Sequence, residues 1–228
     1  MKKLLRITLW ELTLQARQHI LTVIAVITVI YSLIFMLFDE LPNQVVILLI
    51  STDPTMLGFL FIGVLIMFEK GSKTIEAVVL TPIKKSEYLL AKIISLTGIA
   101  LVASTVMALA SQKEFNFFVL AIAVLLSSAQ FLLIGFLGVV RVKTINQYLF
   151  TFPFFISPLM LPLLNFFEFT DSIFLYIFPF QACLLLFKAA FEPILMWQWI
   201  YALIYLPLST IGFYVLALKF YDKYLIQN

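Results

Sequence analysis

The chain has 228 residues, of which 63% are hydrophobic and only 12% are charged, and its formal net charge is +3. A soluble domain is roughly 45–50% apolar and about 25% charged, so this composition excludes an ordinary soluble protein and indicates an integral membrane protein. The apolar runs extend over about 20 residues instead of alternating over about 10, which predicts a helical bundle and not a β-barrel. The single Cys183 excludes an intrachain disulfide and a cysteine metal cluster.

The first 18 residues begin with a basic cluster, as a signal peptide does, but Glu11 and Gln15 interrupt any apolar core and no small-residue cleavage site follows. At helical spacing, apolar stripes alternate with a strip that carries Lys2, Arg6 and Arg17. This pattern predicts an amphipathic helix over residues 2–18 that lies on the cytoplasmic lipid surface. A cytoplasmic extension of the first span is the alternative.

The rest of the chain predicts an all-α membrane protein with a single transmembrane domain. Six transmembrane spans are expected, over residues 20–38, 53–68, 88–110, 117–140, 147–167 and 197–218. Asp53 as N-cap and Pro54 at the first helical position start the second span, and residues 45–52 form a lead-in at the outer boundary.

The two segments before the last span are irregular. Three prolines, Pro153, Pro158 and Pro162, predict a bent fifth span. Residues 172–192 are nearly long enough to cross, but Pro179 interrupts them, and their Lys and Glu would be costly at mid-bilayer. A re-entrant pair of short helices on the outer side is therefore expected there.

The distribution of basic residues predicts the orientation. With six spans and both termini in the cytoplasm, all of the 15 Lys and Arg residues except Lys113 and Lys188 lie on the cytoplasmic side. Counting residues 172–192 as a seventh span would move Lys219 and Lys223 outside. The expected location is the cell membrane of a bacterium or archaeon, as a multi-pass protein.

Sites for chemistry are not predicted. Gly71, Ser72, Lys73 and Thr74 superficially resemble a phosphate-binding loop, but the other glycines that such a loop needs are missing. No catalytic or metal-binding motif and no nucleic-acid partner is expected, so the chain is not predicted to be an enzyme. Polar residues inside the predicted spans could contact a substrate or form helix-packing hydrogen bonds, and those selected for a substrate path are Thr105, Ser127, Gln130, Ser157 and Thr210.

The longest charged interruption runs from Glu69 to Lys92. Its pattern is an acidic end to the second span, a Lys-Gly turn, Thr-x-Glu, Thr-Pro and an acidic-aromatic pair before a Lys. This pattern resembles the type-2 ATP-binding-cassette (ABC) transporter permeases, and the chain is most similar to the small drug and fluoroquinolone exporters among them. The haem-export and polysaccharide-export branches share much of this architecture.

The resemblance implies a permease subunit that binds no cofactor, with ATP and Mg on a separate pair of ABC ATPase subunits and with a second, identical or related permease. It implies that region 69–87 docks on the ATPase. The coupling residues that it implies are Glu69, Lys70, Gly71, Thr74, Glu76, Thr81, Pro82, Glu87 and Tyr88. The expected cargo is a hydrophobic or amphipathic drug, lipid-like molecule or peptide. The alternatives are a non-transporting membrane module, such as an immunity, sensor or assembly subunit, and a standalone secondary carrier.

Overall fold

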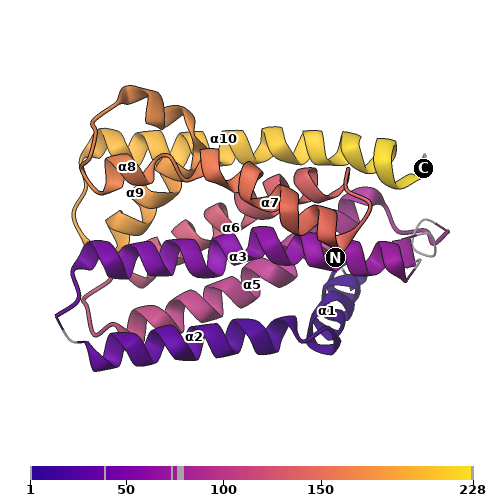
Figure 1. Cartoon of the computed structure of the whole chain (residues 1–228), viewed down its shortest axis with the longest axis horizontal. Coiled ribbons are helices and arrows are strands. Elements are labelled where there is room, and N and C mark those ends of the chain that lie inside the picture. The colour runs from indigo at the N-terminus through magenta and orange to yellow at the C-terminus, as the bar shows by residue number, and fades with distance from the viewer. Residues whose placement is uncertain (1, 39, 73, 76–79, 227–228) are drawn as a thin grey trace.

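The computed structural model describes residues 2–38, 40–72, 74–75 and 80–226 and consists of helices and their connections (Figure 1). Long helices lie side by side in an elongated bundle, and α1 crosses one end of it at a steep angle. The elements are α1 (Lys2–Arg17), α2 (Ile20–Leu37), α3 (Asn43–Gly71), α5 (Lys85–Ala110), α6 (Phe117–Val139), α7 (Ile145–Leu159), α8 (Leu163–Phe166), the 3₁₀ helix η1 (Ile173–Ile177), α9 (Pro179–Phe191), α10 (Met196–Tyr221) and the π-helical turn η2 (Asp222–Ile226).

Among the described residues, five helices are long and apolar enough to cross a membrane: α2, α3, α5, α6 and α10 with its continuation. The mean hydropathy of their most apolar windows lies between 1.8 and 2.8. The prediction of an all-α membrane protein is confirmed at this level.

Helix α6 forms the centre of the bundle, where it packs against α3, α5, α9 and α10. Its Phe131 and Phe136 are fully buried. By contrast, α2 and α10 turn large apolar side chains such as Val29 and Ile204 outward, each more than half exposed. In a membrane, those side chains face lipid or another chain.

The predicted start of the second span at Asp53 and Pro54 is wrong. Helix α3 begins at Asn43, directly after Pro42, and continues without a break through residues 53 and 54. The supposed lead-in is part of the core, because Val46 and Ile50 are fully buried. Tertiary packing of this first part of α3 against α6 and α9 outweighs the local signal for a helix start.

The other boundaries differ less. Helix α5 begins three residues before the predicted third span, and the Glu87 carboxylate accepts a hydrogen bond of 2.9 Å from the Lys84 N–H at this helix start. The predicted fifth span is divided into α7 and α8 by a turn at residues 160–162, next to Pro158 and Pro162. Residues 172–192 do form two short helices, η1 and α9, and α9 is almost entirely buried.

The amphipathic N-terminal helix is separate from the first span. His19 adopts a left-handed backbone conformation with φ of 59°, which is uncommon for a residue with a side chain and ends the helical path after Gln18. Helix α1 is therefore not a continuation of α2. It packs on α5 and on the start of α2 instead.

Candidate functional site

A buried group of charged side chains joins three helices at the end of the bundle that carries α1. We call it the carboxylate–lysine cluster, and it consists of Glu11, Glu69, Tyr88 and Lys92. The Lys92 Nζ atom lies 3.0 Å and 2.9 Å from the two carboxylate oxygens of Glu11. It also donates to Glu69 Oε1, while the Tyr88 hydroxyl donates to Glu69 Oε2. The cluster thus connects α1, the last turn of α3 and the first turns of α5.

Helix α1 takes part because it turns a polar stripe inward. Thr8, Glu11 and Gln15 recur every three or four residues and are buried, whereas Leu5 and Leu9 are more than half exposed. This places the apolar stripe outward, as expected for a helix at a lipid surface. One turn beyond the cluster, Gln15 Nε2 donates to Ser95 Oγ at 2.7 Å and extends the polar seam between α1 and α5.

The cluster is electrostatically unusual because two carboxylates bind the same ammonium group in a place that is shielded from solvent. Lys92 and Glu11 have no exposed surface, and Glu69 is 2% exposed. Burial raises the pKa of the Glu11 carboxyl above its ordinary value, opposed by the charge of Lys92 and reinforced by the charge of Glu69. If all three groups are ionised, the cluster carries one excess negative charge.

A second layer of contacts ties the same end of the bundle together. Lys3 donates to the carbonyl oxygen of Pro82 at 2.6 Å and pairs with Glu87 at 2.7 Å, so α1 holds the segment that leads into α5. Lys70 donates at 2.9 Å to the carbonyl oxygens of both Val140 and Val142, where α6 ends.

Helix α10 is attached to this layer as well. Lys85 pairs with Asp222, and the Tyr88 ring packs on Tyr221 with 5.4 Å between ring centroids. The helices α1, α3, α5, α6 and α10 are therefore linked through polar or aromatic contacts at this end.

The structure divides the predicted coupling residues into two groups. Four face inward to other elements: Glu69 and Tyr88 in the cluster, Lys70 at the end of α6, and Glu87 on Lys3. Others lie on or near the surface of the loop between α3 and α5: Gly71, Thr81 and Pro82 are exposed, and the Thr74 hydroxyl is 2.8 Å from that of Ser72. Glu76 lies outside the described residues.

Sequence reasoning missed three residues of this region as site residues. Lys92 was part of the recognised pattern but was not assigned a role, and Glu11 was read only as an interruption of an apolar segment. An isolated carboxylate on the inward face of a basic amphipathic helix is the signal that could have found Glu11. The third is Leu80, whose side chain is 89% exposed beside Thr81 and Pro82.

The predicted substrate-path residues are only partly brought together. Gln130 on α6 accepts hydrogen bonds from Thr210 at 2.6 Å and from Ser209 at 3.1 Å, both on α10. Thr105 instead donates to the Leu101 carbonyl of its own helix. Ser127 is buried in α6, and Ser157 is exposed on α7. Of these five residues, a hydrogen bond joins Gln130 and Thr210, and whether the five line a substrate path stays a prediction.

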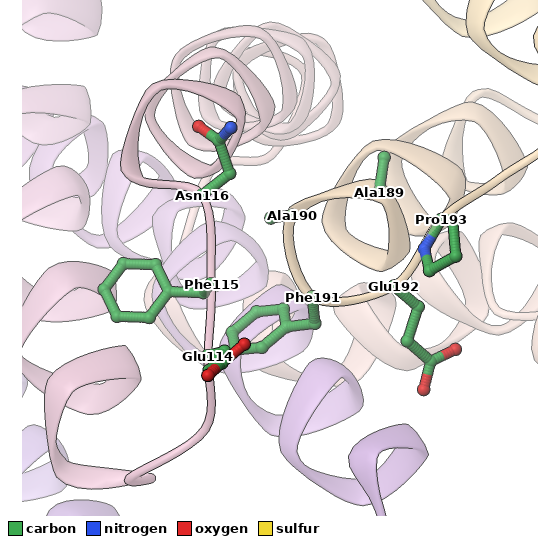
Figure 2. A pocket seen from close by; sticks show the side chains of 8 residues that line it. All are labelled: Glu114, Phe115, Asn116, Ala189, Ala190, Phe191, Glu192 and Pro193. Atoms are coloured by element: carbon green, nitrogen blue, oxygen red, sulfur yellow. The ribbon is translucent and has the colours of Figure 1, made fainter.

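A shallow pocket of about 370 Å³ lies between the loop before α6 and the end of α9. Figure 2 shows Phe115 and Phe191 beside Glu114, with Glu192 at the other margin. The Asn116 N–H donates to the Ala190 carbonyl at 2.8 Å, which fastens the start of α6 to the end of α9. No group of three His, Cys, Asp or Glu side chains suited to a metal occurs in the part of the chain that the structure describes.

Five long apolar helices, with a charged seam at one end, define a multi-pass helical membrane protein. The model of the fluoroquinolones export permease protein family matches residues 2–228, and the chain belongs to this family of export permeases.

Two relatives from Mycobacterium tuberculosis extend the comparison. They are the fluoroquinolones export permease proteins Rv2687c of strain H37Rv and MT2761 of strain CDC 1551 / Oshkosh. Each is 29% identical over 231 residues, covering 96% of this chain and 94% of the relative. The resemblance drawn from the pattern between Glu69 and Lys92 is confirmed by these matches at the level of drug-export permeases.

Proposed function

We propose that the chain is the permease subunit of an ATP-driven exporter that moves small amphipathic molecules out of the cell. The observation that carries this proposal is the carboxylate–lysine cluster. It lies where the exposed loop between α3 and α5 joins the bundle. A displacement of the loop would therefore act directly on the buried polar contacts among α1, α3 and α5.

In this proposal, the bundle lies in the plasma membrane of a bacterium with both termini in the cytoplasm. Six crossings are completed by α7 together with α8, and η1 with α9 forms a re-entrant segment on the outer side. The end that carries α1 and the C-terminus is then cytoplasmic (Figure 1). This orientation agrees with the excess of Lys and Arg in the segments at that end.

The exposed tip of the loop is the proposed docking point for a separate ATPase subunit. Leu80, Thr81 and Pro82 project from the bundle, and Lys3 holds the Pro82 carbonyl from α1. Movement of the tip would shift the end of α3, which carries Glu69, and the first turns of α5, which carry Lys92. Two copies of the permease, or this chain and a related one, would pair with two ATPase subunits that bind ATP and Mg.

The proposed substrates include fluoroquinolones, because the curated relatives bear that name. No group on this chain is needed for bond-breaking chemistry. Energy enters through the partner, and the permease contributes helices that change their packing.

The test uses the chain expressed together with an ABC ATPase subunit that co-purifies with it. ATP is added to the medium outside inverted membrane vesicles, which exposes it to the cytoplasmic face, and ciprofloxacin uptake is measured with the proton gradient dissipated by an ionophore. We expect uptake that requires ATP and a catalytically intact ATPase. Uptake driven by a proton or sodium gradient without any ATPase would refute the proposal and favour a secondary carrier.

A matched pair of substitutions tests the docking point. Leu80→Ser removes the exposed apolar side chain at the loop tip, and Phe169→Ser removes one that is 77% exposed beyond α8. We expect co-purification of the ATPase to fall for Leu80→Ser and to stay unchanged for Phe169→Ser, with equal amounts of both variants in the membrane. Equal retention of the ATPase by both variants would rule out Leu80 as a docking residue.

A further inference from the structure

An apolar groove of about 740 Å³ lies between α1, α2 and α5. We call it the inner groove, and its walls include Thr8 and Leu12 of α1, Ile24 and Thr28 of α2, and Ser95 and Gly98 of α5. This volume is typical of pockets for drug-sized ligands, which are about 300–1,000 Å³. The groove opens to the outside of the bundle, since Val29 and Val102 on its margins are 56% and 65% exposed.

The few polar atoms of the inner groove favour a ligand that donates hydrogen bonds. The hydroxyl protons of Thr8, Thr28 and Ser95 are already used, on the carbonyl oxygens of Leu4, Ile24 and Lys92 respectively. What these hydroxyls can still offer a ligand is the acceptor capacity of their oxygens. A ligand N–H or ammonium group can donate to these oxygens, whereas a ligand carboxylate, which only accepts, must face away from them.

The charge of the carboxylate–lysine cluster near the groove also favours a ligand with an ammonium group. Ser95, on the groove wall, follows Lys92 by three residues on α5 and accepts a hydrogen bond from Gln15, one turn beyond Glu11 on α1. The carboxylate–lysine cluster therefore lies next to the cytoplasmic end of the groove. When both carboxylates are ionised, the cluster carries one excess negative charge, which attracts a cation through a medium of low dielectric constant.

A missing side chain creates part of the space. A Cβ atom added to Gly98 would meet nothing within 4 Å, so the groove reaches the backbone of α5 at this point. A larger residue at position 98 would fill the groove without a clash at its Cβ. Gly212 on α10 is a matched control, because its Cβ would also meet nothing within 4 Å and it does not line the groove.

We propose that the inner groove binds one small amphiphile that carries an ammonium group, taken up sideways from the membrane leaflet on the α1 side, and is the first binding site for the exported substrate. This proposal rests on the function proposed above, since it names the site and the charge of the cargo. The bound molecule would touch α1 and α5, the two helices that Glu11 and Lys92 join. A bound molecule would in this way affect the carboxylate–lysine cluster, on which the ATPase is proposed to act.

The binding test uses a cysteine placed in the groove of the complete transporter in membrane vesicles. The native Cys183 is fully buried, so Val102→Cys adds an accessible thiol at the groove margin. We expect ciprofloxacin, which carries a basic amine in addition to its carboxylate, to slow maleimide labelling of this thiol. Nalidixic acid, an acidic quinolone without that amine, should not. Val215→Cys, on the outer face of α10 with the native residue 47% exposed, is the control and should show no protection.

The transport test compares Gly98→Leu with Gly212→Leu at equal membrane abundance. We expect Gly98→Leu to lower ATP-dependent ciprofloxacin uptake about tenfold or more, because the pocket no longer fits the ligand, and Gly212→Leu to leave it unchanged. Equal loss in both variants would overturn the proposal, as would uptake that Gly98→Leu does not affect.

The two tests separate the site from the function. Protection of the thiol at position 102 without any ATP-driven uptake would support the groove and refute the exporter. Uptake without protection would support the exporter and overturn the groove. Protection by ciprofloxacin and nalidixic acid alike, or a thiol that no reagent reaches because lipid or a second copy of the chain covers it, would also overturn the assignment to an amphiphile with an ammonium group.

Discussion

Lys92 and Glu11, 81 residues apart in the sequence, form a two-pronged ion pair in which both carboxylate oxygens lie within 3.0 Å of one ammonium group. Neither side chain has exposed surface. A buried pair of this kind contributes little net stability by itself, because desolvation offsets the attraction, but it strongly opposes any arrangement that separates the partners. The pair therefore fixes the position of α1 on α5 and resists sliding between them.

Removing the shared cation should be severely destabilising. Lys92→Met leaves two buried carboxylates without a counter-charge, and we expect a loss of about 3–5 kcal/mol in the free energy of unfolding. The measurement is the midpoint of thermal unfolding of the purified protein in detergent. Lys219→Met, which removes an exposed lysine of α10, is the control and should change little.

A compensating variant distinguishes charge from packing in this result. Adding Glu11→Gln and Glu69→Gln to Lys92→Met removes the unpaired charges, and we expect much of the lost stability to return. If the triple variant is as unstable as Lys92→Met alone, the role of Lys92 is that of a space-filling side chain.

Glu11 should make stability dependent on pH. Its pKa is raised, chiefly by burial, so the folded protein holds this proton more tightly than the unfolded chain does. The stability that the proton contributes is complete below the ordinary carboxyl value of 4.5 and is lost as the pH rises through the folded value. The facing groups that set this balance are Lys92 and Glu69. We expect the unfolding midpoint to fall over this pH interval in the native protein and to fall less in Glu11→Gln; equal slopes would contradict the prediction.

Much of this region could be predicted from the sequence because its signals are local. The apolar runs predicted the helical membrane fold, and the charged pattern from Glu69 to Lys92 included residues that do make contacts between helices, Glu69, Lys70 and Tyr88. The contact that joins α1 to this region could not be predicted. Glu11 meets Lys92 only because α1 folds back across α5, and a single sequence carries no period or spacing that reports a contact between segments 81 residues apart.

The start of α3 shows that a strong local signal in the sequence can also be misleading. Asp53 and Pro54 carry a strong local signal for a helix start, yet the helix passes through both positions. Burial of Val46, Ile47 and Ile50 against neighbouring helices stabilises the earlier turns. In a membrane bundle, packing of the neighbours can compensate for the hydrogen bond that a proline lacks, and a local rule for helix starts does not include those neighbours.

A substitution at the contact between Gln130 and Thr210 tests whether these residues serve only in helix packing or also contact the substrate. Thr210→Val removes the 2.6 Å hydrogen bond between α10 and α6 but keeps the shape of the side chain. Hydrogen bonds of this kind in membranes contribute about 0.6 kcal/mol on average, so we expect a small loss of stability. We expect ciprofloxacin uptake per molecule of transporter to stay the same, because only Gln130 and Thr210 of the five predicted path residues are brought together. A large loss of uptake at unchanged stability would return Thr210 to the substrate path.

Gly63 provides the sharpest steric test of how α7 is attached to the bundle. A Cβ atom at this position would lie 2.0 Å from Cζ of the Tyr148 ring, which sits directly over the glycine. The Tyr148 hydroxyl donates to the Phe59 carbonyl at 3.0 Å, so this side chain is inserted against α3 and helps to anchor α7. Gly63→Ala should expel this ring, with a cost of roughly 1–3 kcal/mol from overpacking.

The control and the rescue for this substitution are both available in the chain. Gly138→Ala on α6 places its Cβ no closer than 3.9 Å to any neighbour and should be neutral or slightly stabilising, because alanine favours helix. Combining Gly63→Ala with Tyr148→Leu shortens the colliding side chain, and we expect the double variant to be more stable than Gly63→Ala alone. Thermal unfolding of the four proteins measures this directly. If Gly63→Ala and Gly138→Ala unfold at the same temperature, α7 is not held to α3 by the Tyr148 ring.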